Sequence, residues 1–208
     1  MGKVISYFAR NVIARGLSCP SFPDENKMRS YFFDDDYTRL RSLQHLSRLS
    51  ICSRPLLFYP GCGVDLFTPL LYLEFLFPEV KEVSFRFVDT EPVFDILLTI
   101  LDDVGIPFAR LPNSYIDFYW KTTLVHLQFE QTNVFIRIST MEKFDIYFEK
   151  AFRIMKEQES SFEMMVFKKL NQNGVIISDN GFRQFPLCFL DVPSDLSAYG
   201  EMVVGIKN

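Results

Sequence analysis

Short apolar runs alternate with longer amphipathic stretches along most of this chain of 208 residues. Four of these runs are too short for helices and fit strands that are buried on both faces. The predicted strands are Leu56–Tyr59, Val83–Val88, Phe144–Phe148 and Val175–Ser178. The stretch Pro69–Phe77 is apolar nearly all round and predicts a helix packed on the sheet, with Thr68 as its N-cap. A second helix follows at residues 93–104, and Gly105 ends it.

The second half of the chain continues the alternation of strands and helices. Its predicted elements are an aromatic loop at 107–121, a half-buried strand at 122–130, a further strand at 134–139 that completes a hairpin, a helix from about 160 to 170, and a terminal antiparallel hairpin of 187–192 with 202–207. The helix prediction rests on the capping-box spacing of Ser160 and Glu163, and Asn173-Gly174 is expected to stop that helix.

The first 53 residues differ in character from the rest. Val4, Ile5, Phe8, Val12 and Ile13 fall at helical spacing and predict a first helix, which residues 18–24 break. Leucines three residues apart, at 40, 43, 46 and 49, predict a second helix over about 37–50. We therefore expect an N-terminal helical extension, residues 1–53, followed by an α/β domain, residues 54–208.

Two turns carry the candidate chemistry. Pro60-Gly61-Cys62-Gly63 follows the first strand, and two glycines one residue apart allow a sharp turn and leave bare backbone for a ligand. Asp89-Thr90-Glu91-Pro92 follows the second strand, where a carboxylate is placed to bind ribose hydroxyls. The alternative for the glycines is a plain strand–helix turn, and the alternative for Asp89 is an N-cap of the next helix.

These two turns resemble the glycine motif and the acidic turn of the class I S-adenosylmethionine-dependent methyltransferases. The resemblance implies a three-layer Rossmann-like sandwich, with a mostly parallel seven-stranded sheet and a C-terminal antiparallel hairpin. It also implies S-adenosylmethionine as cofactor and an N-terminal extension over the substrate side. The sequence departs from the family pattern at Tyr59, where a carboxylate is usual, and at Asp65, which replaces the third glycine and could substitute for that carboxylate.

The resemblance assigns the candidate cofactor contacts. They are Tyr59, Gly61, Cys62, Gly63 and Asp65 at the methionine end, Asp89 at the ribose and Thr90 beside the adenosine. The substrate-side candidates follow the fourth and fifth strands, whose carboxyl ends face the ligand crevice. They are Glu149, Lys150, Asp179 and Asn180, and a solvated charge pair at a strand end is the alternative for the first two.

Three functions are compatible with these turns. The first is a methyltransferase-like protein that binds S-adenosylmethionine and acts on an unknown acceptor. The second is a binding or regulatory module that keeps the fold without methyl transfer, an alternative that Tyr59 and Asp65 motivate. The third, a nicotinamide-dependent oxidoreductase, is disfavoured by the missing third glycine and by the absence of a catalytic Tyr-x-x-x-Lys pair. The sequence leaves open whether the protein is an enzyme.

Composition narrows the remaining classes. The net charge of −4 argues against a protein that binds the phosphate backbone of nucleic acids. Four cysteines and two histidines show no metal-ligand spacing, so no metal site is expected, and free thiols suit a reducing cytoplasm. No apolar run approaches 20 residues, so no transmembrane segment is expected, and no secretory signal is expected either. Gly2 fits a myristoylation pattern, but a packing helix is the favoured interpretation.

Overall fold

The computed structural model describes residues 5–46, 48–196 and 200–208, and these form one mixed sheet with helices on both faces. The strands are β1 Leu56–Pro60, β2 Glu82–Asp89, β3 Phe108–Leu111, β4 Tyr115–Trp120, β5 Thr123–Gln131, β6 Phe144–Phe148, β7 Leu170–Ser178, β8 Leu187–Phe189 and β9 Val203–Lys207. The α-helices are α1 Glu25–Ser30, α2 Asp34–Leu40, α3 Phe67–Leu76, α4 Phe94–Asp103, α5 Val134–Thr140, α6 Arg153–Gln158 and α7 Phe162–Lys169, and short 3-10 helices span Arg41–His45 and Ser194–Leu196.

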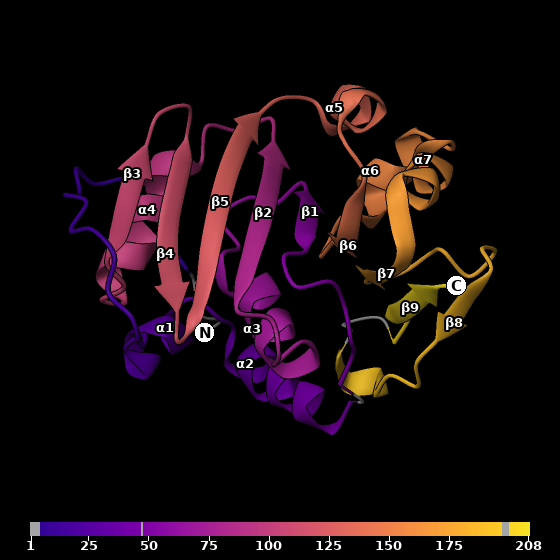
Figure 1. Ribbon diagram of the computed structural model, residues 1–208, viewed down its shortest axis with the longest axis horizontal. Helices are drawn as coiled ribbons and strands as arrows, with labels where there is room; N and C mark the ends of the chain where they lie inside the picture. The colour runs from indigo at the N-terminus through magenta and orange to yellow at the C-terminus, as the bar shows by residue number, and fades with distance from the viewer. Residues whose placement is uncertain (1–4, 47, 197–199) are drawn as a thin grey trace.

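The sheet runs across the molecule from β3 at one edge to β8 at the other, in the order β3-β4-β5-β2-β1-β6-β7-β9-β8 (Figure 1). The five strands from β5 to β7 in this order are mutually parallel. The pairs at both ends are antiparallel, and the β8–β9 pair confirms the predicted terminal hairpin. The expected seven-stranded sheet is wrong in number, because the aromatic stretch expected as a loop forms both β3 and β4 and extends the sheet to nine strands.

Alternation along each central strand divides the core between the two faces of the sheet. In β1, Leu57 and Tyr59 belong to one buried cluster and Phe58 to the other. The first cluster contains the apolar sides of α3 and α4, whereas the second contains those of α5 and α7. Most of the phenylalanines lie in these two clusters, as a phenylalanine-rich core requires. None of the helices within the described ranges is long and apolar enough to cross a membrane.

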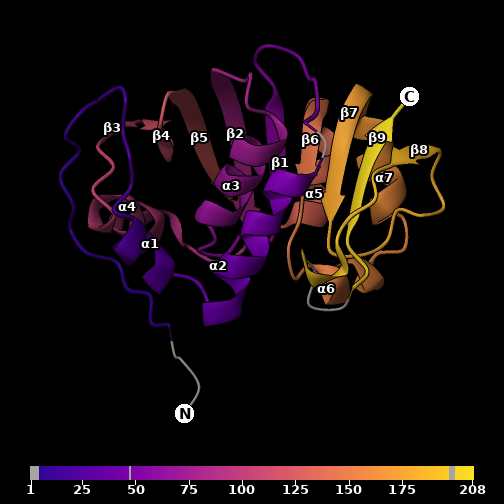
Figure 2. The same ribbon diagram turned by 90° about the horizontal axis from the view of Figure 1, so that it is seen from below.

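Residues 5–18 run along the α4 side of the molecule as an irregular segment (Figure 2). The predicted first helix is wrong for the described residues 5–18, where Phe8 and Ile13 are exposed, and its Val4 lies outside the described residues. Backbone bonds fix the segment instead, from Arg10 N–H to the Thr99 hydroxyl and from Gly16 N–H to the Phe108 carbonyl. The predicted second helix begins earlier, as α2, and tightens into the 3-10 helix at Arg41–His45. The proposed division at residue 53 stays a prediction.

Three other predicted elements differ from the structure. Residues 134–139 form helix α5 and not a strand, because the Asn133 side chain accepts the Phe135 N–H and caps a helix. Asn173-Gly174 does not stop a helix but lies within β7. The capping box at Ser160 is absent, since α7 begins at Phe162 and Glu163 bonds elsewhere, accepting from the backbone N–H of Phe182.

Parallel strands place the loops that follow them at one edge of the sheet. After β1 the chain pairs with β2 on one side and β6 on the other, so the strand order changes direction at β1. In open α/β sheets, ligands bind at the carboxyl ends of the strands beside such a switch point. The ends of β1, β2, β6 and β7 and the loops that follow them meet there, and they carry the candidate site residues.

Candidate functional site

The glycine turn after β1 requires its glycines. Gly61 and Gly63 have φ values of +58° and +50°, a region that side chains with a Cβ rarely adopt. The Gly61 N–H donates to the Val88 carbonyl at 2.8 Å, which ties the turn to the end of β2. A Cβ at Gly63 would meet nothing within 4 Å, so the positive φ and not a close contact is what favours glycine there.

The backbone at Gly61 is covered by an aromatic ring. A Cβ built on Gly61 would lie 2.5 Å from Cδ2 of Phe152, a buried side chain that directly precedes α6. Gly61 therefore lets the chain pass under the ring, and the bare backbone expected for a ligand is occupied by protein. Sequence reasoning missed Phe152, because a phenylalanine far from any motif has no local signal that distinguishes it from a core residue.

Asp89 joins the two predicted turns. One carboxylate oxygen accepts the Gly63 N–H at 2.8 Å, and the other accepts the Glu91 N–H at 3.0 Å. Asp89 is therefore not the N-cap of α4, which begins at Phe94 with Val93 in the cap position. The bond to Gly63 spans 26 residues of sequence and fixes the glycine turn against the end of β2. Thr90, the next residue, is exposed.

Asp65 caps the helix that follows the glycine turn. Its carboxylate accepts the Tyr59 hydroxyl at 3.0 Å and the Thr68 N–H at 3.1 Å. The predicted cap at Thr68 is wrong, because α3 begins at Phe67 and Asp65 supplies the capping oxygen. Burial, and then the Asp65 charge, raise the pKa of Tyr59 well above its ordinary value, so the phenol stays protonated. Burial likewise raises the pKa of the Cys62 thiol, which argues against a nucleophile there.

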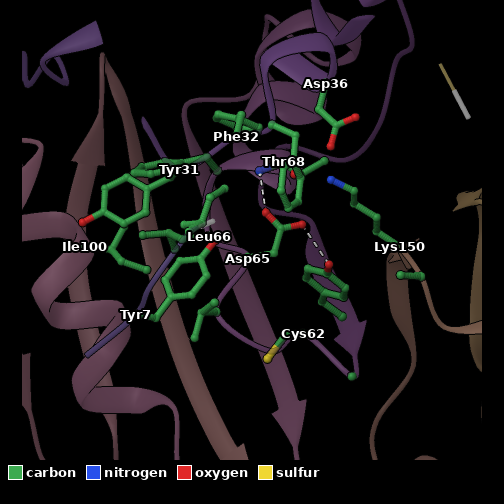
Figure 3. A pocket seen from close by; sticks show the side chains of 17 residues that line it. Tyr7, Tyr31, Phe32, Asp36, Cys62, Asp65, Leu66, Thr68, Ile100 and Lys150 are labelled. Atoms are coloured by element: carbon green, nitrogen blue, oxygen red, sulfur yellow. Dashed lines mark hydrogen bonds between the residues drawn. The ribbon is translucent and has the colours of Figure 1, made fainter. Parts of the chain in front are cut away.

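Three cavities lie along this edge of the sheet. The central cavity, about 330 Å³, is lined by Tyr59, Gly61, Cys62, Asp65 and Lys150 among others, and Tyr7 of the N-terminal segment covers it (Figure 3). The Asp89 cavity, about 290 Å³, is lined by Gly61, Asp89, Thr90, Phe135 and Phe152 among others. The Tyr72 cavity, about 540 Å³, is lined by Tyr72, Glu149, Lys150, Asp179 and Met202 among others.

The cavities are neighbours. Gly61 and Ala151 line both the central and the Asp89 cavity, so the Phe152 ring above Gly61 lies at their boundary. Thr68 and Lys150 line both the central and the Tyr72 cavity. The structure thus brings most of the predicted site residues to one cleft. Gly63 and Asn180 line none of these three cavities.

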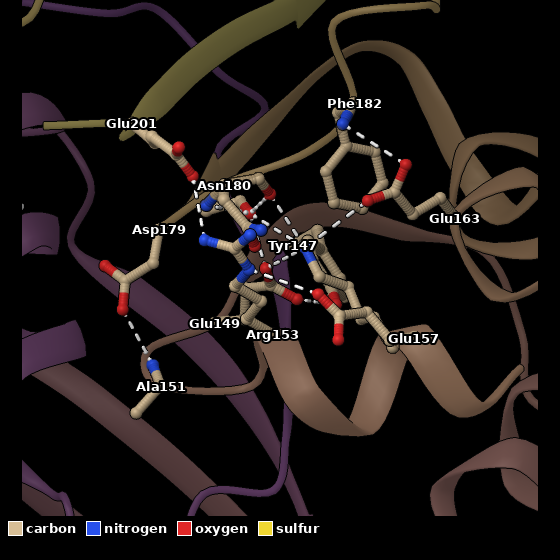
Figure 4. A network of polar contacts seen from close by, with 12 residues as sticks. Tyr147, Glu149, Ala151, Arg153, Glu157, Glu163, Asp179, Asn180, Phe182 and Glu201 are labelled. Carbon is tan, nitrogen blue, oxygen red and sulfur yellow. Dashed lines mark hydrogen bonds and ion pairs between the residues drawn. The ribbon is translucent and has the colours of Figure 1, made fainter. Parts of the chain in front are cut away.

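Glu149 belongs to a buried polar network and not to a solvated charge pair (Figure 4). Its carboxylate accepts from the Lys156 ammonium, the Ser178 hydroxyl and the Tyr147 hydroxyl. The same ammonium donates to the Asn180 carbonyl at 2.7 Å. This network holds the loop after β6 against the loop after β7, and thereby positions the residues between them.

Lys150 and Asp179 are the charged groups that this network leaves facing the cavities. Lys150 extends toward Thr68 and Asp36, across the boundary of the central and Tyr72 cavities (Figure 3). One oxygen of Asp179 accepts the Ala151 N–H at 2.7 Å, which joins the loops after β6 and β7. Burial raises the pKa of Asp179, against the Ala151 N–H and the charges of Lys150 and Lys156, which lower it, and the Asp65 carboxylate adds a smaller rise. Asp179 therefore lies in the same region of the cleft as both lysines and Asp65.

Within residues 5–46, 48–196 and 200–208, no cluster of three or more histidine, cysteine, aspartate or glutamate residues could hold a metal ion. The four cysteines, Cys19, Cys52, Cys62 and Cys188, are free thiols. His126, on β5, lies between two carboxylates, with Nδ1 2.7 Å from Asp117 and Nε2 3.3 Å from Glu82. Its strand pairs with β2 and β4, away from the cleft residues.

Comparisons with known proteins give structural matches only. No protein family and no curated protein matches the sequence. Among solved structures, a methyltransferase from Podospora anserina in its SAH-bound form matches with a TM-score of 0.43 and 11% identity, over 90% of this chain and 82% of that one.

Two further matches cover a smaller part of the solved protein. A SAM-dependent methyltransferase from Thiobacillus denitrificans, in complex with S-adenosyl-L-homocysteine, matches with a TM-score of 0.41 and 11% identity over 74% of this chain. A precorrin 8w decarboxylase from Methanobacterium thermoautotrophicum matches with a TM-score of 0.37 and 14% identity over 68% of it. This chain spans 53% and 60% of those two proteins, respectively. Several of the solved structures to which the chain is similar are thus methyltransferases by name.

Proposed function

We propose that the protein binds S-adenosylmethionine across the Asp89 cavity and the central cavity, as a methyltransferase-like protein with an unidentified methyl acceptor. The observation that carries the proposal is the fixed negative charge at the N-terminus of α3, where Asp65 accepts the Thr68 N–H. When bound, the sulfonium would supply an electrophilic methyl carbon. The adjoining Tyr72 cavity offers the room for an acceptor.

The two carboxylates at the glycine turn favour S-adenosylmethionine over a dinucleotide. A dinucleotide would place its pyrophosphate on the glycine turn and on the N-terminus of the following helix. Here the N–H groups of Gly63 and Thr68 already donate to the carboxylates of Asp89 and Asp65. A pyrophosphate would displace those bonds and meet two like charges, whereas a sulfonium or ammonium group is attracted by the same carboxylates.

The residues of the cleft fit the two ends of S-adenosylmethionine. Each Asp89 oxygen accepts one backbone N–H, and a carboxylate has about four lone-pair sites, so capacity remains for the ribose hydroxyls. Thr90 and Phe135 line the rest of the Asp89 cavity beside the position of the base. At the other end, Asp65 would hold the ammonium group and Lys150 the carboxylate.

One contact favours the second candidate, a module that keeps the fold without methyl transfer. Phe152 covers Gly61 between the two cavities, so a ligand that spans both has to displace the ring. If the ring stays in place, the Asp89 cavity accepts a nucleoside alone and no methyl group reaches the central cavity. Tyr59 also supports this candidate, because it stands at the position where the family usually has a carboxylate and its hydroxyl donates to Asp65.

Calorimetric titration distinguishes the candidates. We expect micromolar binding of S-adenosylmethionine or S-adenosylhomocysteine and no heat with NAD. The Asp89→Ala variant should bind either ligand more weakly, and Asp191→Ala, which removes an exposed carboxylate outside the three cavities, serves as the matched control. Binding of adenosine alone would favour the module. No binding of any adenosine compound would refute the proposed cofactor site.

A further inference from the structure

The Tyr72 cavity is lined by Thr68, whose hydroxyl is buried and has no hydrogen-bond partner among the described residues. Thr68 is 2% exposed, and the unpartnered atom is its Oγ1. A buried polar atom without a partner costs free energy, and most such atoms in native proteins are paired. The second residue of a helix is well placed to present this hydroxyl to a ligand.

A second hydroxyl lies one helical turn further along α3. Residues four apart share a helix face, so Tyr72 lines the same cavity as Thr68. The Tyr72 hydroxyl donates to the thioether sulfur of Met202 at 3.1 Å, and a thioether is only a weak acceptor. Burial, and then the charges of Asp179 and Asp65, raise the pKa of Tyr72, so its phenol stays neutral and its oxygen can accept a bond.

A carboxylate completes the polar side of the cavity. Asp179 uses one oxygen to accept the Ala151 N–H and contributes to the lining at the end of β7. The other charged lining groups have partners within the protein: Arg39 pairs with Asp36, Arg153 with Glu157 and Glu201, and Glu149 with Lys156. Lys150 extends toward Asp36 at the boundary with the central cavity, where the proposed function assigns it to the cofactor (Figure 3).

The remaining lining is apolar. It consists of Leu40, Phe148, Ala151, Ile154, Leu196 and Met202. A mostly apolar pocket with a few convergent polar groups is the usual form of a small-molecule site. Here the convergent groups are three oxygens that can accept hydrogen bonds, one of them a carboxylate. The group that satisfies all three is a donor with several N–H bonds and a positive charge.

We propose that the Tyr72 cavity binds a small amine with an apolar body, whose ammonium group donates to Asp179, Thr68 and Tyr72. This inference names a class of methyl acceptor for the proposed function. It rests on the proposed function only for the methylation of the amine. Binding itself requires no cofactor. A test without cofactor therefore separates failure of this inference from failure of the proposed function.

Three matched probes provide the test: 2-phenylethylamine, 2-phenylethanol and phenylacetate, which share an apolar body and differ in the polar group. Ligand-observed NMR on the full chain without cofactor gives their relative affinities. We expect the amine to bind about tenfold more tightly than the alcohol, and phenylacetate to bind weakest, because a charge-assisted bond to a carboxylate is stronger than a neutral one. Equal or tighter binding of phenylacetate would overturn the inference.

Two variants locate the site. Asp179→Asn keeps an oxygen for the Ala151 N–H but removes the charge, and it should weaken amine binding about tenfold and abolish the preference over the alcohol. Thr68→Val removes only the unpartnered hydroxyl and should weaken amine binding several-fold with the fold intact, as circular dichroism would check. Asp191→Asn is the control for charge removal. Unchanged amine affinity in a folded Asp179→Asn or Thr68→Val protein would show that the amine binds elsewhere.

Discussion

Replacement of Lys156 by methionine tests the buried network most directly. The side chains of Lys156 and Glu149 are 5% and 0% exposed, so their attraction is not screened by solvent. Methionine keeps most of the apolar stem but leaves the Glu149 charge buried without its partner, and removing one member of a buried pair costs about 3–5 kcal/mol. For a chain of this size, that corresponds to a fall in melting temperature of about 6–20 °C.

The pH dependence of this variant has a definite sign. Burial raises the pKa of Glu149 above its unfolded value, so its contribution to stability is fully present below the unfolded pKa and is lost as the pH rises through the folded pKa. Loss of the Lys156 ammonium removes an interaction that lowers this pKa and raises it further. The Lys156→Met variant should therefore be closer to wild type in stability at pH 5 than at pH 8.

Urea unfolding followed by circular dichroism at both pH values measures the effect. Adding Glu149→Gln to Lys156→Met removes the unpaired charge and should recover a large part of the loss. A cost below about 1 kcal/mol at pH 8, or no recovery in the double variant, would contradict an ion pair with the energetics of a buried one.

Three further predictions concern the cleft. Gly61→Ala places a methyl group against Phe152 in a positive-φ conformation, so it should destabilise the fold by at least about 2 kcal/mol. Gly63→Ala has the same positive φ but open space around the methyl group, so it should cost only about 1–2 kcal/mol, and equal losses in urea unfolding would contradict the Phe152 contact. Thr68→Val should leave the free energy of unfolding unchanged or raise it by about 1 kcal/mol, because no hydrogen bond is lost, and a clear loss would reveal a partner for Oγ1. Asp89→Ala should weaken the binding of S-adenosylhomocysteine by about 1–3 kcal/mol in calorimetry, and an unchanged affinity would remove Asp89 from the ribose role.

The parallel strands and the two turns could be predicted because their signals are local. An apolar run such as Leu56–Tyr59 and a pair of glycines at positive φ depend little on distant residues. The helix α5 could not be found in this way, because its β-branched residues favour a strand. Val134 and Ile138 both face the core at helical spacing, while Ile136, which a strand would bury with them, is 67% exposed.

The two turns of the candidate site could be predicted from the sequence, but the contacts that join them to other loops could not. Tyr59, Asp65 and Asp89 were identified from motif positions, but their partners were not, since the bond from Asp89 to Gly63 depends on how β1 and β2 pair. Tyr72 lies one helical turn after Thr68, so helical spacing could have predicted that both side chains line the same cavity. The contact of Phe152 with Gly61 joins the loop after β6 to the loop after β1, and it has no counterpart in the local sequence.

The Phe152 ring between two cavities makes the affinity of a spanning ligand smaller than its two halves suggest. In the proposed binding mode, adenosine or methionine alone would occupy one side, whereas a molecule that contains both would bind only after the ring has moved. If the ring is displaced in one molecule in about 100, the apparent Kd of the spanning ligand is about 100 times its intrinsic value. Any second ligand or bound chain that held the ring aside would remove this factor without touching the first ligand. The position of this one side chain would then determine the ligand concentration at which the cleft fills, and a partner that moved the ring would lower that concentration.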